Sequence, residues 1–209
     1  MGSDAAQRAR DTENIGPQHD VYARHEFDLV QAPERVRVQA RQANSSDIPM
    51  VLRAAEAAIG APLADETVVR DLVRAHPDTV WVFWRNGLIV GGVALLMLNA
   101  TGIARLIANR IDLKRPPVDL LAPPGHPPAA IYVWALLGRL THAEGVSRVI
   151  VRLQQPPYRQ SDMFALPATA DGLRFLHRLG FRLVPNDQRS LYRYVRLANR
   201  TQSAERAIA

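Results

Sequence analysis

The chain has 209 residues, of which 47% are hydrophobic and 22% charged, so it is long enough to bury the core of one globular domain. Cysteine is absent, which excludes disulfides, thiolate metal sites and cysteine nucleophiles. The formal net charge is +6, carried almost entirely by arginine, because Lys114 is the only lysine. A solvated basic surface, an anionic small ligand and a nucleic acid all fit this charge. The arginines form no stripe interleaved with aromatic residues, so nucleic acid is the least favoured partner.

Both ends of the chain are polar. Residues 1–34 are charged and aperiodic, and we expect them to form a flexible N-terminal tail with no signal peptide. The longest apolar run, 88–100, is too short to span a bilayer and suits a buried strand. We therefore expect a cytoplasmic protein with no membrane partner, one domain over 35–197 and a C-terminal tail over 198–209.

Hydrophobic periodicity and turn residues divide the domain into a series of strands and helices. The predicted elements are a strand at 36–43, helices at 44–60 and 64–77, a pair of strands at 78–98, an insertion at 102–128, a strand at 128–138, a helix at 141–155, a strand at 162–167, a helix at 169–180 and strands at 181–185 and 190–197. This order predicts a single α/β domain with a mixed (α+β) sheet.

Two glycine signals and a proline-rich segment stand out within this series. Asn86-Gly87 between two β-rich runs is the strongest hairpin signal, and Gly91-Gly92 predicts a bulge or a close backbone approach. The insertion opens with a short helical stretch and continues into the Pro-rich run "KRPPVDLLAPPGHPP". An insertion of this length between strands suggests a functional or lid-like role.

The stretch "GRLTHAEGV", 138–146, joins the most continuous apolar strand to a helix. A helix N-terminus offers free N–H groups to phosphate oxygens, and Arg139 would add a charge-assisted contact. Thr141 and Glu144 have the spacing of a capping box, so an ordinary capped helix is the alternative. No P-loop, dinucleotide fingerprint or nucleophile elbow is present, and the histidines lack paired ligand spacing, so we predict no metal site.

Two longer stretches carry a family resemblance. "RQANSSDIPMVLRAAEAA" resembles the opening of the GNAT acyltransferase superfamily, with an Arg-x-Ala strand end, Asp-Ile-Pro and an apolar helix. "FALPATADGLRFLHRLGFRLV" resembles its closing strand and the helix that runs into Leu-Gly-Phe. Together with the element order, the resemblance covers about residues 36–195. It implies a GNAT-like acyl-CoA N-acyltransferase fold with acetyl-CoA as co-substrate.

The resemblance also implies a binding site. The strand backbone of Trp134, Ala135, Leu136 and Leu137 would hold the pantetheine arm, and the turn after it would hold the pyrophosphate. The residues of that turn are Gly138, Arg139, Leu140, Thr141, His142 and Ala143. Thr169 would cap the closing helix and bond a ligand, and Gly172 would allow its close approach. His142 and Glu144 replace small residues of the family loop.

The catalytic groups follow the family pattern less well. Leu176 stands where many members have a proton-donating tyrosine, and Tyr158 and Tyr132 are nearby in sequence only. A general base for an amine acceptor should be Glu, Asp or His, and we name His126 first and Glu56 second. Ordinary surface positions are the alternative for both. For the aromatic residues of the central strands, core packing is favoured over walls of an acceptor site; these are Trp81, Phe83, Trp84 and Trp134.

These features predict an N-acetyltransferase that moves an acetyl group from acetyl-CoA to an amine by direct attack. The acceptor is a small-molecule or protein amine, and a homodimer is left open. The alternative is a GNAT-fold module that has lost catalysis and senses acyl-CoA or binds a protein, which the missing tyrosine and the divergent loop favour.

Overall fold

The computed structural model describes residues 37–59, 64–137, 143–185 and 187–196. The elements, in chain order, are β1 (Gln39–Gln42), α1 (Ile48–Ile59), α2 (Glu66–Ala75), the 3-10 turn η1 (Pro77–Thr79), β2 (Val80–Arg85), β3 (Leu88–Leu98), α3 (Ala100–Ile107), the 3-10 turn η2 (Val118–Leu120), β4 (Ala130–Leu137), α4 (Ala143–Leu153), β5 (Asp162–Ala165), α5 (Ala170–Arg178), β6 (Arg182–Leu183) and β7 (Tyr192–Tyr194). This is the predicted order apart from η1, which lies where the strand pair was predicted to begin. The predicted insertion, 102–128, contains η2 and most of α3, which begins two residues earlier, at Ala100. The predicted tail boundaries lie outside the described residues and stay predictions.

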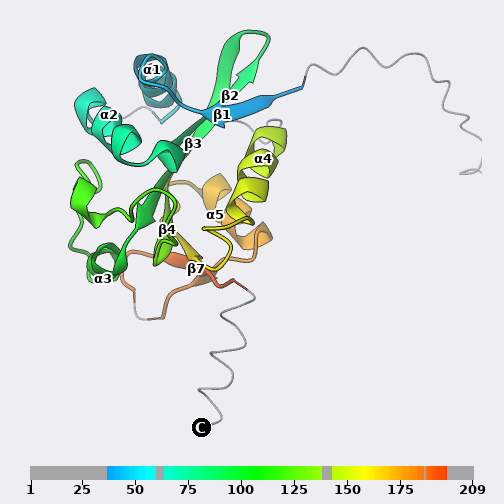
Figure 1. The fold of residues 1–209 in the computed structure, drawn as a ribbon. Helices are drawn as coiled ribbons and strands as arrows, with labels where there is room; N and C mark the ends of the chain where they lie inside the picture. The colour runs from blue at the N-terminus through cyan, green and yellow to red at the C-terminus, as the bar shows by residue number, and fades with distance from the viewer. Residues whose placement is uncertain (1–36, 60–63, 138–142, 186, 197–209) are drawn as a thin grey trace, which may run out of the picture. The chain divides into compact units, whose positions relative to one another are not determined.

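The strands form one seven-stranded sheet in the order β1-β2-β3-β4-β5-β7-β6. Among the described strands only β4 and β5 pair in parallel, so the predicted mixed sheet is confirmed. Helices α1, α2 and α3 cover one face, called here the α1–α3 face, and α4 and α5 cover the other, the α4 face (Figure 1). Alternation along β2 separates the two cores: Val82 packs on the α1–α3 face and Phe83 on the α4 face.

Both glycine predictions in the hairpin are confirmed. Asn86 and Gly87 have φ of 51° and 74°, as a two-residue turn of type I′ requires. The register between β2 and β3 shifts at Phe83 and Trp84, beside the glycine pair. A Cβ on Gly92 would lie 2.7 Å from the Trp81 carbonyl oxygen, so only glycine lets the two backbones approach this closely.

The Pro-rich insertion is anchored on the end of β3. The Ala122 N–H donates to the Met97 carbonyl oxygen at 2.7 Å, and Leu121 forms a β-bridge with Leu98. The Asn99 side-chain amide donates to the Asp119 and Leu121 carbonyl oxygens at 2.7 and 3.2 Å. Backbone and side-chain bonds therefore fix this segment against the sheet.

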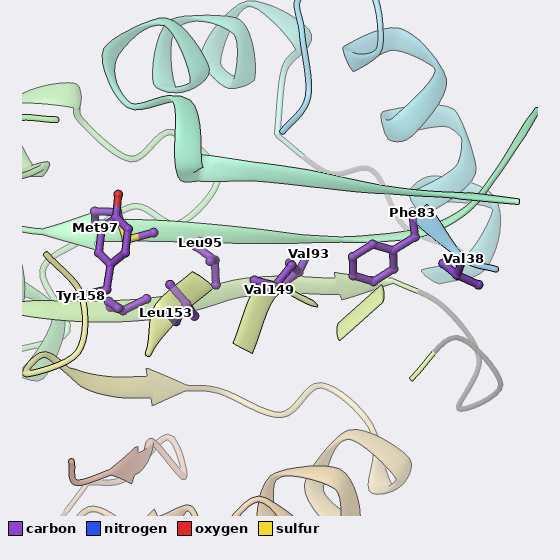
Figure 2. Packing of buried hydrophobic residues seen from close by; sticks show 9 residues of the cluster. Val38, Phe83, Val93, Leu95, Met97, Val149, Leu153 and Tyr158 are labelled. Carbon is purple, nitrogen blue, oxygen red and sulfur yellow. The ribbon is translucent and has the colours of Figure 1, made fainter. Parts of the chain in front are cut away.

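The core of the α4 face runs the length of the sheet, as Figure 2 shows, from Val38 and Phe83 at one end to Met97 and Tyr158 at the other. A buried polar cluster closes the second end. The Tyr158 hydroxyl donates to Asp78 Oδ2 at 2.5 Å, and Arg152 lies 3.3 Å from the same oxygen. In the described part of the chain no helix is long and apolar enough to cross a membrane.

His76 borders this cluster and is 1% exposed, with neither ring nitrogen hydrogen-bonded to a described residue. Its ring lies 6.2 Å from the Tyr158 ring. Burial lowers the pKa of His76, and Asp78 opposes this effect only in part, while Arg152 adds to it. The folded protein therefore favours the neutral imidazole.

This burial predicts a pH-dependent stability. Because the folded pKa lies below the unfolded value of 6.5, the unfolded chain takes up the proton first as pH falls. The contribution of His76 is complete above the unfolded pKa and is lost as pH falls toward the folded pKa. As pH falls from about 7.5 to about 5.5, we expect the titration of His76 to lower the free energy of unfolding by roughly 1 kcal/mol, measured by urea denaturation. His76→Gln should remove that part of the pH dependence, whereas His126→Gln, at an exposed histidine, should retain it. Equal pH dependence in the wild type and His76→Gln would contradict this account.

Candidate functional site

The parallel pairing of β4 and β5 ends halfway along β4. The ladder runs from Ala130 and Asp162 to Val133 and Ala165, and β4 then continues to Leu137 paired only with β3. The β5-facing backbone of 134–137 is thus outside the ladder, and its N–H and C=O groups are not bonded to β5. These are the strand residues named from the sequence; the point at which the strands separate carries no local sequence signal.

The separation begins at a β-bulge. Ala94 pairs with Ala135 and Leu95 with Val133, so Trp134 is the extra residue of β4. Its indole Nε1 donates to the Leu113 carbonyl oxygen of the insertion at 2.8 Å. The ring packs against both hydrophobic clusters of the α1–α3 face. No local signal in the sequence indicates the hydrogen bond between Trp134 and Leu113.

Helix α4 follows β4 in the chain, and residues 138–142 between them lie outside the described residues. The helix reaches the sheet through Gly145, because a Cβ at this position would lie 2.7 Å from the Phe83 ring. Phe83 itself is fully buried. Gly145 therefore serves close packing of the first turn of α4 on β2.

Glu144, in the first turn of α4, bonds to β1 and to its own helix. Its Oε2 accepts a hydrogen bond from the Val38 N–H at 3.1 Å, and Arg148 lies 3.3 Å from Oε1. The Val38 bond lowers the pKa of Glu144, and Arg148 and Arg37 contribute. The carboxylate is thus held as an anion, with arginines beside it. The capping-box prediction did not foresee the bond to Val38.

The predicted cap of α5 is present. The Thr169 Oγ1 accepts a hydrogen bond from the Gly172 N–H at 3.0 Å, and a Cβ on Gly172 would lie 3.2 Å from that oxygen. A surface pocket lies beside Thr169 and is lined by Leu173, Ser190 and Tyr192 as well. Because Tyr192 belongs to β7, this pocket is on the far side of β5 from β4. A role for Thr169 and Gly172 in binding a ligand stays a prediction.

The two candidate bases lie apart from the end of β4. His126 is exposed and precedes β4, and the site backbone is at the opposite end of this strand. Its Nδ1 is 3.3 Å from the Pro124 carbonyl oxygen. Glu56 is exposed on α1, which covers the α1–α3 face. Their roles stay predictions, and the structure brings neither into contact with 134–137.

Neither tyrosine hydroxyl considered as a proton donor is placed beside the open strand, and Leu176 has no proton to donate. Leu176 is 7% exposed and packs in the core under α5. The Tyr158 hydroxyl is bonded to Asp78, at the opposite end of the α4-face core from Phe83. Burial raises the pKa of Tyr132 to about 12, and its ring lies where β4 is still paired with β5.

No family model and no curated protein matches the sequence. Among solved structures, the chain is similar to the loading GNATL domain of CurA from Lyngbya majuscula, with a TM-score of 0.55, 13% identity, and coverage of 76% of this chain and 97% of that one. It is also similar to Ard1 from Thermoplasma volcanium (TM-score 0.48, 15% identity, coverage 76% and 95%). A third neighbour is Arabidopsis thaliana Naa50 in complex with the bisubstrate analogue CoA-Ac-MVNAL (TM-score 0.48, 12% identity, coverage 76% and 97%).

The likeness to the CurA domain, at low identity, establishes the fold. The sheet order, the parallel β4–β5 pair and the helices on both faces agree with it. The chain has the GNAT fold, and the resemblance found in the sequence is confirmed at this level.

The packing of Gly145 predicts a loss of stability when a methyl group is added. Gly145→Ala places a Cβ 2.7 Å from the Phe83 ring, so α4 must move from the sheet. We expect the free energy of unfolding to fall by about 1–3 kcal/mol, measured by urea denaturation. The matched control is Gly172→Ala in α5, where the nearest atom is the Thr169 hydroxyl at 3.2 Å. Because alanine favours a helix by up to about 1 kcal/mol, this control should be near neutral. A Gly145→Ala protein as stable as the wild type would refute the tight contact.

Proposed function

We propose that the protein is an acyl-CoA-dependent N-acetyltransferase that transfers the acetyl group of acetyl-CoA to an amine. The observation that carries this proposal is the end of the β4–β5 ladder at Val133 and Ala165, with the N-terminus of α4 following β4. An open strand edge beside a helix N-terminus suits a ligand with amide groups at one end and phosphates at the other.

The chemistry of the described residues fits such a ligand. The backbone of 134–137 would pair with the amides of the pantetheine arm, as a further strand pairs with a sheet edge. Leu136 projects on the α4 face and is 41% exposed, so it would supply an apolar contact. The first turn of α4, with Arg148 and Arg37 near Glu144, would face the phosphates. Gly138, Arg139, Leu140, Thr141 and His142, which lie outside the described residues, complete this proposed site.

The reaction would proceed by direct attack of a neutral amine on the acyl carbon. Acetyl-CoA supplies the activated thioester: the new C–N bond forms, the C–S bond breaks, and the thiolate leaves. The strand backbone would orient the acyl group and donate N–H bonds to its oxygen. The proton of the amine would pass to His126 or Glu56, or to a water that one of them holds. The acceptor is an amine of a small molecule or a protein.

A second candidate function is an acyl-CoA sensor or a protein-interaction module without catalysis. The specific observation in its favour is the burial of Leu176, because a leucine in the core under α5 cannot protonate a thiolate. The hydroxyl of Tyr158 is engaged elsewhere as well. A transferase and an acyl-CoA sensor both require acyl-CoA binding. Only the transferase requires transfer of the acetyl group to an amine.

Titration calorimetry with acetyl-CoA and a longer acyl-CoA tests the common requirement. We expect acetyl-CoA to bind with a dissociation constant of about 1 mM or below. Thiol release with a panel of small amines and peptides then separates the transferase, which releases CoA only when an acceptor is present, from the sensor, which releases none. Absence of binding to both acyl-CoA compounds at millimolar concentration would overturn the transferase and sensor proposals together.

The proposed phosphate contact predicts a difference between two arginines. Arg139→Glu should weaken acetyl-CoA binding by about tenfold or more, because a charge-assisted bond is replaced by repulsion. Arg182→Glu is the matched control, since Arg182 is exposed on β6 at the sheet edge. It should change the dissociation constant by less than about twofold. Equal effects of the two substitutions would place the phosphates elsewhere.

A further inference from the structure

The point at which the two strands separate locates the acyl end of the co-substrate, if the proposed function holds. A chain that lies along β4 from the N-terminus of α4 can follow the open edge only as far as Trp134, because at Val133 the ladder with β5 is closed. From Leu137 back to Trp134 the strand spans about 10 Å. The acyl group would therefore end beside the bulge.

An amine must reach this point past the side chains of β4. On the α4 face lies the proposed co-substrate itself, in contact with the exposed Leu136 and directed toward the first turn of α4. The open edge itself is taken by the co-substrate. The remaining approach is from the α1–α3 face, where the side chain at the bulge is Trp134.

Trp134 is fixed in position by the insertion. Its indole Nε1 donates to the Leu113 carbonyl oxygen at 2.8 Å, and the side chains of Leu113 and Ile111 pack on the same cluster as the indole ring. The ring is half-buried, so one part of it faces solvent. A half-buried, hydrogen-bonded aromatic ring is a rigid wall rather than a flexible one.

The insertion that bonds to Trp134 also contacts α2. Arg115 of the insertion pairs with Asp65, at the N-terminus of α2, at 2.9 Å. Both side chains are largely exposed, so this ion pair adds little stability, but it marks where the segment after Leu113 crosses to the helix. Later in the insertion, Ala122 and Leu121 bond to the end of β3. The insertion therefore has one contact to α2 just after Leu113 and a second, stronger attachment to β3.

We propose that Trp134 is a specificity-determining residue. Held by the Leu113 carbonyl oxygen, it forms the wall on the acceptor side of the acyl group and restricts the acceptor to small-molecule amines, excluding a polypeptide. This inference rests on the proposed N-acetyltransferase function and names its substrate class.

The test compares Trp134→Ala and Trp134→Phe with the wild type, using thiol release with small primary amines and with a lysine-containing hexapeptide. The wild type should favour the small amines in kcat/KM. Trp134→Ala should lower that preference by about tenfold or more, because removal of a wall opens the site to a larger acceptor. Trp134→Phe keeps a ring but loses the bond to Leu113 and should lower it by about threefold. Titration calorimetry establishes for each variant that acetyl-CoA still binds, because the backbone of Trp134 belongs to the proposed binding strand.

Trp84→Ala is the matched control, because Trp84 is a half-buried tryptophan of the α1–α3 face on β2, two strands from β4. It should leave the preference unchanged. If Trp134→Ala does not fold, as thermal unfolding would show, Trp134→Phe decides. An unchanged preference in folded variants that bind acetyl-CoA, or a wild type that favours the peptide, overturns this inference alone. Acetyl-CoA binding without transfer to either acceptor overturns both the inference about Trp134 and the proposed transferase function. Absence of acetyl-CoA binding overturns the transferase function before any acceptor is tested.

Discussion

The end of parallel pairing between β4 and β5 is the constraint on which the site depends. Backbone N–H and C=O groups require partners, and a central strand that loses one neighbour must find them in a ligand or in water. The bulge at Trp134 produces this situation without breaking the ladder with β3 on the other side. The sheet thus remains continuous through β3 and β4 while one edge of β4 is open.

Packing on the α4 face fixes the position of the first turn of α4, the helix that follows the open edge of β4 in the chain. Gly145 allows α4 to approach Phe83, and Glu144 bonds the same helix turn to the Val38 N–H beside β1. Two contacts of different kinds, one steric and one polar, therefore position the helix N-terminus. The first strand of the domain and the helix after β4 are fixed to each other although 106 positions separate the two bonded residues.

Much of the fold could be predicted because its signals are local. Asn86-Gly87 encodes its own turn, and alternating residues encode strands whose partners follow from the element order. The candidate site was only partly predictable, because its features arise from pairing over long sequence distances. Nothing near Trp134 indicates a bulge, which depends on the register against Ala94 and Leu95. The bond from Trp134 to Leu113 depends on a backbone carbonyl, and any residue type supplies one.

The anchoring of the insertion affects the edge of the sheet at the end of β3. Strand β2 begins opposite Ala94, so the last residues of β3 extend past it. Leu121 and Ala122 lie along this part of β3 and bond to it where β2 is absent. The Pro-rich segment therefore protects an exposed sheet edge from pairing with another chain. Shortening it as though it were a surface loop would uncover a hydrophobic strand end, which favours aggregation.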